Sequence, residues 1–105
     1  MTGNCGTVQW MAPEVLSNQH YSEAADVYSF AIVFWEMFTA KCPFENLSQV
    51  QVAVEVAHKD IRPELPSFVP VDVQAIIRTC WNQDWTHRPS AEQLLVQLRS
   101  VMPSR

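Results

Sequence analysis

Residues 22–41 read SEAADVYSFAIVFWEMFTAK, and within residues 27–38 only Ser29 and Glu36 are polar. A surface helix carries a polar side at helical spacing, and this stretch shows none. The apolar run is shorter than the roughly 20 residues that a membrane span needs, and the Glu36 carboxylate is costly in lipid. We therefore predict a buried central helix in a globular protein and no membrane span.

The ends of this predicted helix carry the expected signals. Ser22 is a suitable N-cap, and Asp26 lies in the first turns, where the helix dipole favours a carboxylate. At the other end Lys41 also suits the dipole, and Pro43 is expected to stop the helix.

The composition indicates one small globular domain. The chain has 105 residues, is 48% hydrophobic and carries a net charge of −4, with no cluster of Lys and Arg. We therefore do not expect it to bind nucleic acid. The three cysteines form no CxxC pair and the N-terminus does not resemble a signal peptide, so we expect a cytoplasmic location. The three histidines are scattered without ligand spacing, and we expect no metal site.

Residues 46–59 also favour a helix. They contain a capping box formed by Ser48 and Gln51. Four apolar residues share one helical face: Val50, Ala53, Val54 and Ala57. Two further valines, Val52 and Val56, shift the pattern toward a strand, but the capping box and the length favour a helix.

Two more amphipathic helices follow a loop with three prolines at residues 61–70. In residues 71–82, apolar side chains recur at helical spacing: Val73, Ile76, Ile77, Cys80 and Trp81. Residues 90–102 begin with a capping box of Ser90 and Gln93. Their apolar face comprises Leu94, Leu95, Leu98, Val101 and Met102. The predicted fold is mainly α, with about four helices around one buried central helix and no strand.

Three separated motifs resemble the C-terminal part of a eukaryotic protein kinase domain. Residues 6–14, GTVQWMAPE, resemble the end of an activation segment with its A-P-E motif. Residues 26–36, DVYSFAIVFWE, resemble the central helix of the kinase large lobe, and Cys80-Trp81 with Arg88-Pro89 resemble a segment near the end of that lobe. The sequence of these motifs is most similar to that of the tyrosine-kinase-like group, whose members mostly phosphorylate Ser or Thr. The resemblance implies that residues 1–105 form a partial kinase domain, from the end of the activation segment to the last helix of the large lobe.

The resemblance also implies structural roles. Within the A-P-E motif of Ala12, Pro13 and Glu14, the glutamate is expected to form a buried ion pair with Arg88. From the charges alone, two exposed and unrelated side chains would be preferred. Asp26 is implied to hydrogen-bond the backbone of a catalytic loop; the alternative is a surface carboxylate placed by the helix dipole.

Other implied roles concern the substrate. Thr7 would contact the catalytic aspartate, and Trp10 and Met11 would help to form the pocket for the residue after the phosphoacceptor. Core packing is the alternative for both Trp10 and Met11. Thr2 falls where activating phosphorylation occurs in the family, although the arginine that its phosphate would need lies outside this chain.

The motifs that bind ATP and Mg²⁺ and carry catalysis in kinases are not found in this sequence. It has 2 Gly and lacks the Gly-rich loop, the strand lysine, the H-R-D motif and the D-F-G motif. We expect the chain alone to be inactive, and ATP, Mg²⁺ and a protein substrate to belong to a complete parent domain that adds the N-lobe and catalytic loop.

The remaining alternatives are a non-catalytic interaction module, docking through residues 45–48 and the helix at 46–59, and a pseudokinase remnant. Because three helices can cover only part of the central helix, we also expect exposed apolar surface.

Overall fold

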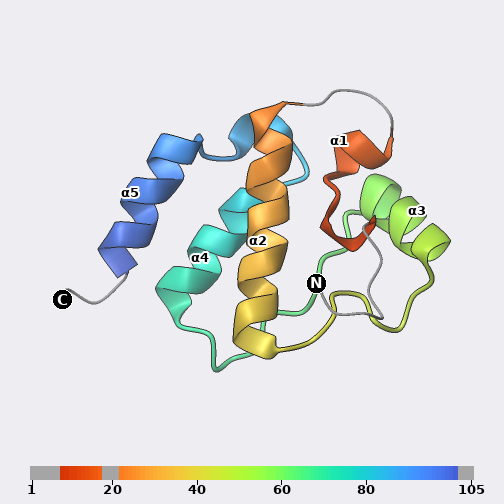
Figure 1. Ribbon diagram of the computed structural model, residues 1–105, viewed down its shortest axis with the longest axis horizontal. Helices are drawn as coiled ribbons and strands as arrows, with labels where there is room; N and C mark the ends of the chain where they lie inside the picture. Colours follow the sequence, from red (N-terminus) through yellow and green to blue (C-terminus); the bar gives the residue numbers. More distant parts are fainter. Residues whose placement is uncertain (1–7, 18–21, 102–105) are drawn as a thin grey trace.

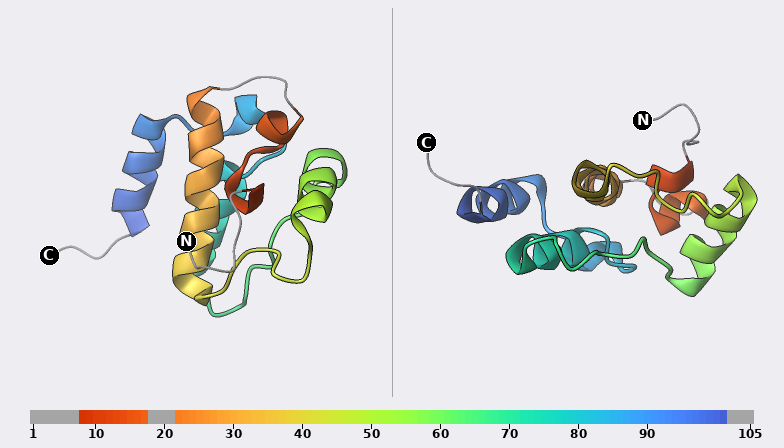
Figure 2. Two further views of the ribbon diagram at one scale, coloured as in Figure 1. Left: turned by 45° about the vertical axis from the view of Figure 1, so that its right-hand side comes forward. Right: turned by 90° about the horizontal axis from the view of Figure 1, so that it is seen from below.

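The computed structural model describes residues 8–17 and 22–101, with one long helix, α2 (Glu23–Thr39), through its middle (Figure 1). Helix α5 (Ala91–Val101) and helix α3 (Gln49–Lys59) lie on opposite sides of α2. Helix α4 (Val71–Cys80) packs against α2, and α5 packs against α4. Figure 2 shows the same order from two further directions. The molecule measures 42 × 28 × 22 Å along its principal axes.

Three short elements complete the fold. A 3₁₀ turn, η1 (Val8–Trp10), leads into the single-turn helix α1 (Pro13–Leu16), and η2 (Trp85–His87) lies between α4 and α5. Every regular element in the two described ranges is helical, which confirms the predicted mainly α class. No helix within these ranges is both long and apolar enough to cross a membrane.

Helix α2 begins as predicted but ends early. The Ser22 hydroxyl accepts a hydrogen bond from the Ala24 N–H at 3.2 Å, which confirms the N-cap. The helix ends at Thr39, so the prediction that it continues to Lys41 and stops at Pro43 is wrong. The Thr39 hydroxyl donates to the Trp35 carbonyl and accepts from the Lys41 N–H, and Ala40 takes a left-handed conformation at φ 55°. These local bonds turn the chain before the proline is reached.

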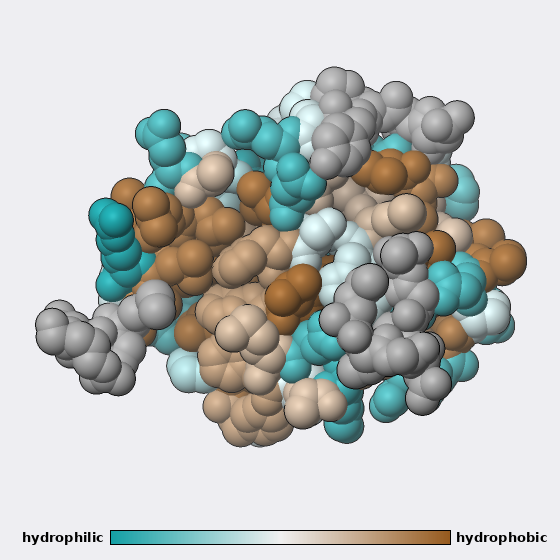
Figure 3. Space-filling model, in the orientation of Figure 1, coloured by the Kyte–Doolittle hydropathy of each residue, from teal (hydrophilic) through white to brown (hydrophobic). Residues whose placement is uncertain are grey.

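One side of α2 is not covered by the described residues. Tyr28, Ile32 and Trp35 are buried, while the side chain of Met37 is 72% exposed and that of Val33 is also exposed. The prediction of burial all round is therefore wrong for this side, while the expected exposed apolar surface is present. Figure 3 shows this apolar face over α2, continuing onto α5.

Helix α3 packs with a different face from the predicted one. The capping box of Ser48 and Gln51 is present, with both reciprocal hydrogen bonds formed. However, Val52 is fully buried and Val50 is 73% exposed, and the same alternation separates buried Val56 from exposed Val54. The predicted stripe is wrong because α3 faces η1 and α1 with Val52 and Val56, the two valines outside the predicted stripe.

The last two helices follow their patterns more closely. All five predicted apolar residues of α4 and its C-cap are buried: Val73, Ile76, Ile77, Cys80 and Trp81. The capping box of Ser90 and Gln93 is present at the start of α5. On α5, Leu94 is buried but Leu95 is exposed, and Met102 lies outside the described residues. The apolar face of α5 is thus only partly covered.

Candidate functional site: the A-P-E segment and its anchors

The segment from η1 to α1 lies between α2 and α3. The side chain of Trp10 is buried, and its carbonyl accepts a hydrogen bond from the Ser29 hydroxyl at 2.5 Å. Met11 turns the other way and is 37% exposed. Trp10 therefore packs into the core and ties η1 to α2, while Met11 is partly exposed to solvent.

Ala12 and Pro13 set the start of α1. Ala12 is buried in an extended conformation as the N-cap, and Pro13 occupies the first helical turn, where its missing N–H costs no helical hydrogen bond. This start places the carboxylate of Glu14 in the first turn of α1, directed into the protein.

Glu14 and Arg88 form a buried ion pair in bidentate geometry. Arg88 Nη1 donates to Glu14 Oε2 at 2.8 Å, and Nη2 donates to Oε1 at 2.9 Å. The side chain of Arg88 is 0% exposed and that of Glu14 is 5% exposed. The predicted contact between these residues, 74 positions apart, is therefore formed.

Arg88 holds more than the carboxylate. Its Nε donates to the Asn82 carbonyl at 2.9 Å, and its Nη1 also donates to the Ala24 carbonyl at 3.0 Å. One guanidinium thus joins α1, the first turn of α2 and the loop after α4. Because a guanidinium offers five donors in a fixed plane, lysine cannot replace this set of bonds.

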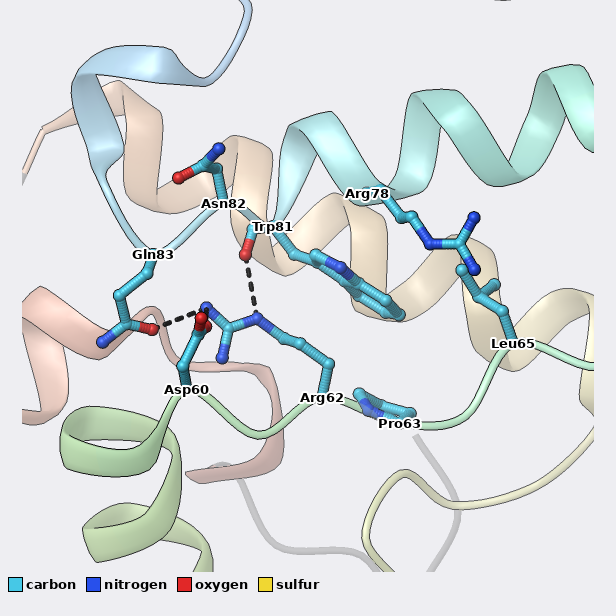
Figure 4. Close-up of a pocket in the computed structure, with 8 residues that line it drawn as sticks. All are labelled: Asp60, Arg62, Pro63, Leu65, Arg78, Trp81, Asn82 and Gln83. Atoms are coloured by element: carbon cyan, nitrogen blue, oxygen red, sulfur yellow. Dashed lines mark hydrogen bonds and ion pairs between the residues drawn. The ribbon is translucent and has the colours of Figure 1, made fainter.

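A second arginine, Arg62, anchors the proline-rich loop (Figure 4). Its Nε donates to the Trp81 carbonyl at 2.8 Å and its Nη2 to Gln83 Oε1 at 2.7 Å, with Asp60 Oδ1 at 3.1 Å. These bonds border a hollow of about 410 Å³ whose lining also includes the exposed Arg78. Because its donors are engaged by the protein, Arg62 serves here to hold the loop against α4.

Tyr28 packs with both anchors. The Arg62 and Arg88 guanidinium carbons lie 5.1 and 5.3 Å from the centre of its ring. Burial raises the pKa of the Tyr28 hydroxyl to about 12, against the opposing effect of the two arginines. The ring therefore stays neutral and gives both cations an aromatic face.

The remaining predicted site residues are Asp26, Thr2 and Thr7. Asp26 is exposed in the first turns of α2 and borders an apolar hollow of about 320 Å³ between α2 and α5. The catalytic-loop role of Asp26 stays a prediction. Thr2 and Thr7 lie outside the described residues.

The described residues do not fit ATP or Mg²⁺. Among residues 8–17 and 22–101 no group of three or more His, Cys, Asp or Glu side chains could hold a metal ion. The whole sequence contains two glycines, too few for the Gly-rich loop that covers kinase phosphates. No step of phosphoryl transfer is therefore assigned to these side chains.

Three polar residues of this region were not predicted: Gln9, Ser29 and Arg62. Only Ser29 carried a signal, as one of two polar residues in the apolar run. Arg62 contacts two backbone carbonyls and the side chains of Asp60 and Gln83, a set of partners that a sequence pattern does not reveal. Gln9 lies between two hydrophobic residues in η1, and nothing in the sequence pattern indicated that its side chain is buried.

We compared the sequence with those of known protein families. The sequence model of the family described as protein tyrosine and serine/threonine kinase matches residues 2–98. The chain belongs to this family. The match covers all three motifs and confirms the resemblance to a kinase of the tyrosine-kinase-like group.

Individual kinases agree with the family match. The chain is 41% identical over 96 residues to the serine/threonine/tyrosine-protein kinase HT1 of Arabidopsis thaliana. It is 38% identical over 101 residues to the serine/threonine-protein kinase STY46 of the same plant, and 38% identical over 96 residues to the probable serine/threonine-protein kinase drkC of Dictyostelium discoideum. These alignments cover 91%, 96% and 91% of the chain, but only 25%, 18% and 13% of the respective relatives.

Proposed function

We propose that this chain forms the substrate-binding part of the large lobe of a protein Ser/Thr kinase domain, and that the whole protein phosphorylates proteins in the cytoplasm. The boundaries of this part are the end of the activation segment and the last helix of the lobe. The buried Glu14–Arg88 pair is the observation that carries the proposal, because it fixes the A-P-E segment against α2 and the loop after α4.

In this proposal the rigid segment presents the substrate contacts. Met11 and Trp10 border the pocket for the residue after the phosphoacceptor, with the exposed Met11 touching the substrate and the buried Trp10 supporting it. Thr7 contacts the catalytic aspartate, Asp26 holds the backbone of the catalytic loop, and Thr2 is a phosphorylation site. Positioning of this kind is a large share of catalysis in phosphoryl transfer.

ATP with Mg²⁺ supplies the transferred phosphoryl group when bound by the complete kinase domain. Since the residues of this chain do not fit those groups, we propose that the N-lobe and catalytic loop hold them. The contribution of the chain is to bind and orient the polypeptide that receives the phosphate.

The proposal is tested by grafting. The matched 96-residue segment of HT1 is replaced by the corresponding residues of this chain, and phosphorylation of a generic protein substrate is measured. The graft should retain activity, and the graft with Arg88→Met should lose it. An inactive graft that is folded and binds ATP would overturn the proposal.

The isolated chain is expected to be inactive, because it carries no ATP-binding motif. Purified chain incubated with labelled ATP should transfer no phosphate above a mock purification from the same host. Turnover that increases with the chain and withstands controls for host kinases would contradict this expectation.

A non-catalytic interaction module is the second candidate, because α3 leaves Val50 and Val54 exposed next to the loop at residues 45–48. The graft distinguishes the two functions. A module would leave the grafted kinase folded but without activity, whereas a kinase large lobe would keep it active.

A further inference from the structure

The hollow of about 410 Å³ beside Arg62 has in its lining a cation that the fold does not use (Figure 4). Arg78 lies on the exposed face of α4 and lines this hollow. Its guanidinium forms no hydrogen bond or ion pair with any other residue in the two described ranges, whereas Arg62 and Arg88 each bind several partners. The N–H donors of Arg78 are therefore available to a ligand.

The unpaired charge of this hollow is a single positive charge. The other two charged residues of its lining pair with each other, since Arg62 Nη2 lies 3.1 Å from Asp60 Oδ1. One guanidinium matches one carboxylate in charge and can bind it through two parallel hydrogen bonds. A phosphate would bring a second negative charge close to the Asp60 carboxylate, whose side chain is 64% exposed. The lining therefore favours a carboxylate over a phosphate.

Exposed apolar side chains accompany Arg78. Leu65 lines the same hollow and is partly exposed. At the start of α4, Val71 is 82% exposed, and Phe68, three residues earlier, is 66% exposed. Val71 and Arg78 are seven residues apart, so they share one face of the helix and lie about 10 Å apart along its axis. The exposed Asp72 disfavours a second acidic group at the start of α4, so an apolar residue of a ligand fits there.

The turn that carries Phe68 is held in place by hydrogen bonds. The Val69 N–H donates to the Pro66 carbonyl at 3.1 Å. The side-chain amide of Gln74 donates to the carbonyls of Val69 and Pro66 at 2.9 and 3.4 Å. An exposed aromatic ring on such a turn can contact a partner without the entropic cost of ordering a loop.

We propose that Leu65, Phe68, Val71 and Arg78 form a docking surface for an acidic segment of a partner polypeptide, here named the α4 docking surface. The carboxylate of an aspartate or glutamate pairs with Arg78 in the hollow, and an apolar residue of the same segment packs on Val71 and Phe68. Because an extended chain advances about 3.4 Å per residue, these two partner residues lie about three positions apart. No residue that lines the hollow belongs to η1, α2 or α5, so the surface is separate from the substrate contacts proposed above.

The test uses the ¹⁵N-labelled chain and a heptapeptide with capped ends, which has glutamate at its centre, leucine at both ends and glycine elsewhere. The leucines lie three positions from the glutamate on either side, so the probe fits in both chain directions. It should shift the signals of the Arg78 Nε–H and the Val71 backbone N–H. Its Kd should be at least about threefold lower than that of the same peptide with a central glutamine, a difference of about 0.7 kcal/mol. Equal Kd values, or shifts confined to other elements, would overturn the proposal.

Matched variants locate the binding. Arg78→Gln should abolish the preference for glutamate over glutamine. Arg99→Gln removes the same charge from an exposed position of α5 outside the hollow and should leave the preference unchanged. Val71→Ser should weaken binding of the leucine-containing probe but not of a probe with glycine in place of both leucines. All three residues are exposed, so the variants should fold. A preference that survives Arg78→Gln, or that Arg99→Gln also removes, would refute the role of Arg78.

The graft into HT1 allows the same binding to be measured in a complete kinase. A fluorescent form of the glutamate probe should bind the graft more tightly than the glutamine form, and Arg78→Gln should remove this difference. Docking does not require phosphate transfer, so the two proposals can fail separately. An active graft that does not distinguish the two peptides would overturn the α4 docking surface and leave the proposed function standing. A folded, ATP-binding graft that distinguishes the peptides but is inactive would overturn the proposed function and support the docking surface.

Discussion

Replacing Arg88 by methionine leaves the Glu14 carboxylate buried without its cation. The two side chains are 0% and 5% exposed and share two hydrogen bonds of 2.8 and 2.9 Å, so solvent does little to screen the pair. Breaking a buried pair in this way costs about 3–5 kcal/mol. The carbonyls of Asn82 and Ala24 also lose a donor, which adds to the cost. Since small domains are stable by only about 5–15 kcal/mol, this variant should be close to unfolding.

The assay is urea denaturation followed by tryptophan fluorescence, combined with a double-mutant cycle using Glu14→Gln. The double variant should be less destabilised than the sum of the two single variants, because each single change leaves a charge unpaired. Glu55→Gln is the matched control, since the Glu55–Lys59 pair spans 3.6 Å between side chains that are 32% and 69% exposed. It should cost no more than about 0.5 kcal/mol. A cost below about 1 kcal/mol for Arg88→Met, or strict additivity in the cycle, would refute the reasoning.

Four further outcomes are expected. Burial raises the pKa of the Cys80 thiol to about 12, so at about pH 8 a thiol reagent should label Cys80 only after denaturation. Equal rates of Cys80 labelling in the native and the denatured protein would argue against this burial. The pKa of Tyr28 is also raised to about 12, so at high pH the native state retains protons that the unfolded state releases. The free energy of unfolding should therefore fall as the pH rises from about 9 to 12. A free energy of unfolding that does not change with pH would be inconsistent with both shifts. Ser48→Ala should lower stability by about 1 kcal/mol in urea titrations, and no loss would mean that the capping box is unimportant. Met37→Glu combined with Leu95→Lys should reduce the fluorescence of a hydrophobic dye and change stability by only about 0.5 kcal/mol; unchanged dye binding would place the apolar surface elsewhere.

Short-range features were predictable from the sequence. The Ser22 cap, both capping boxes and the buried face of α4 depend on residues within a few positions of one another. In α4 the apolar residues follow a single helical period, so one face was clearly favoured. These features are present in the structure because the tertiary contacts agree with the local sequence pattern.

Helix α3 shows why other features were not predictable. Valines occupy positions 50, 52, 54 and 56, and this alternation has no helical period. Which valines are buried depends on where η1 and α1 lie against the helix. The early end of α2 has a similar origin, because the hydroxyl of Thr39 reaches backbone groups on both sides and turns the chain.

The candidate site depended even more on contacts distant in sequence. Glu14 and Arg88 are 74 positions apart, and the pairing was implied only by the resemblance to kinases. The bonds of Arg62 reach across 19 and 21 positions to the end of α4 and the loop that follows. Such contacts form only once α2, α4 and the intervening loops have packed together.

The specificity constant of the grafted HT1 kinase tests the central claim most directly. If this chain is a kinase large lobe in which Glu14 and Arg88 set the substrate-binding segment, the graft should keep kcat/KM within about tenfold of the parent, or about 1.4 kcal/mol in activation free energy. The graft with Arg88→Met should fall by at least about a hundredfold, roughly 2.7 kcal/mol. A folded, ATP-binding graft that is inactive without any substitution would contradict the account.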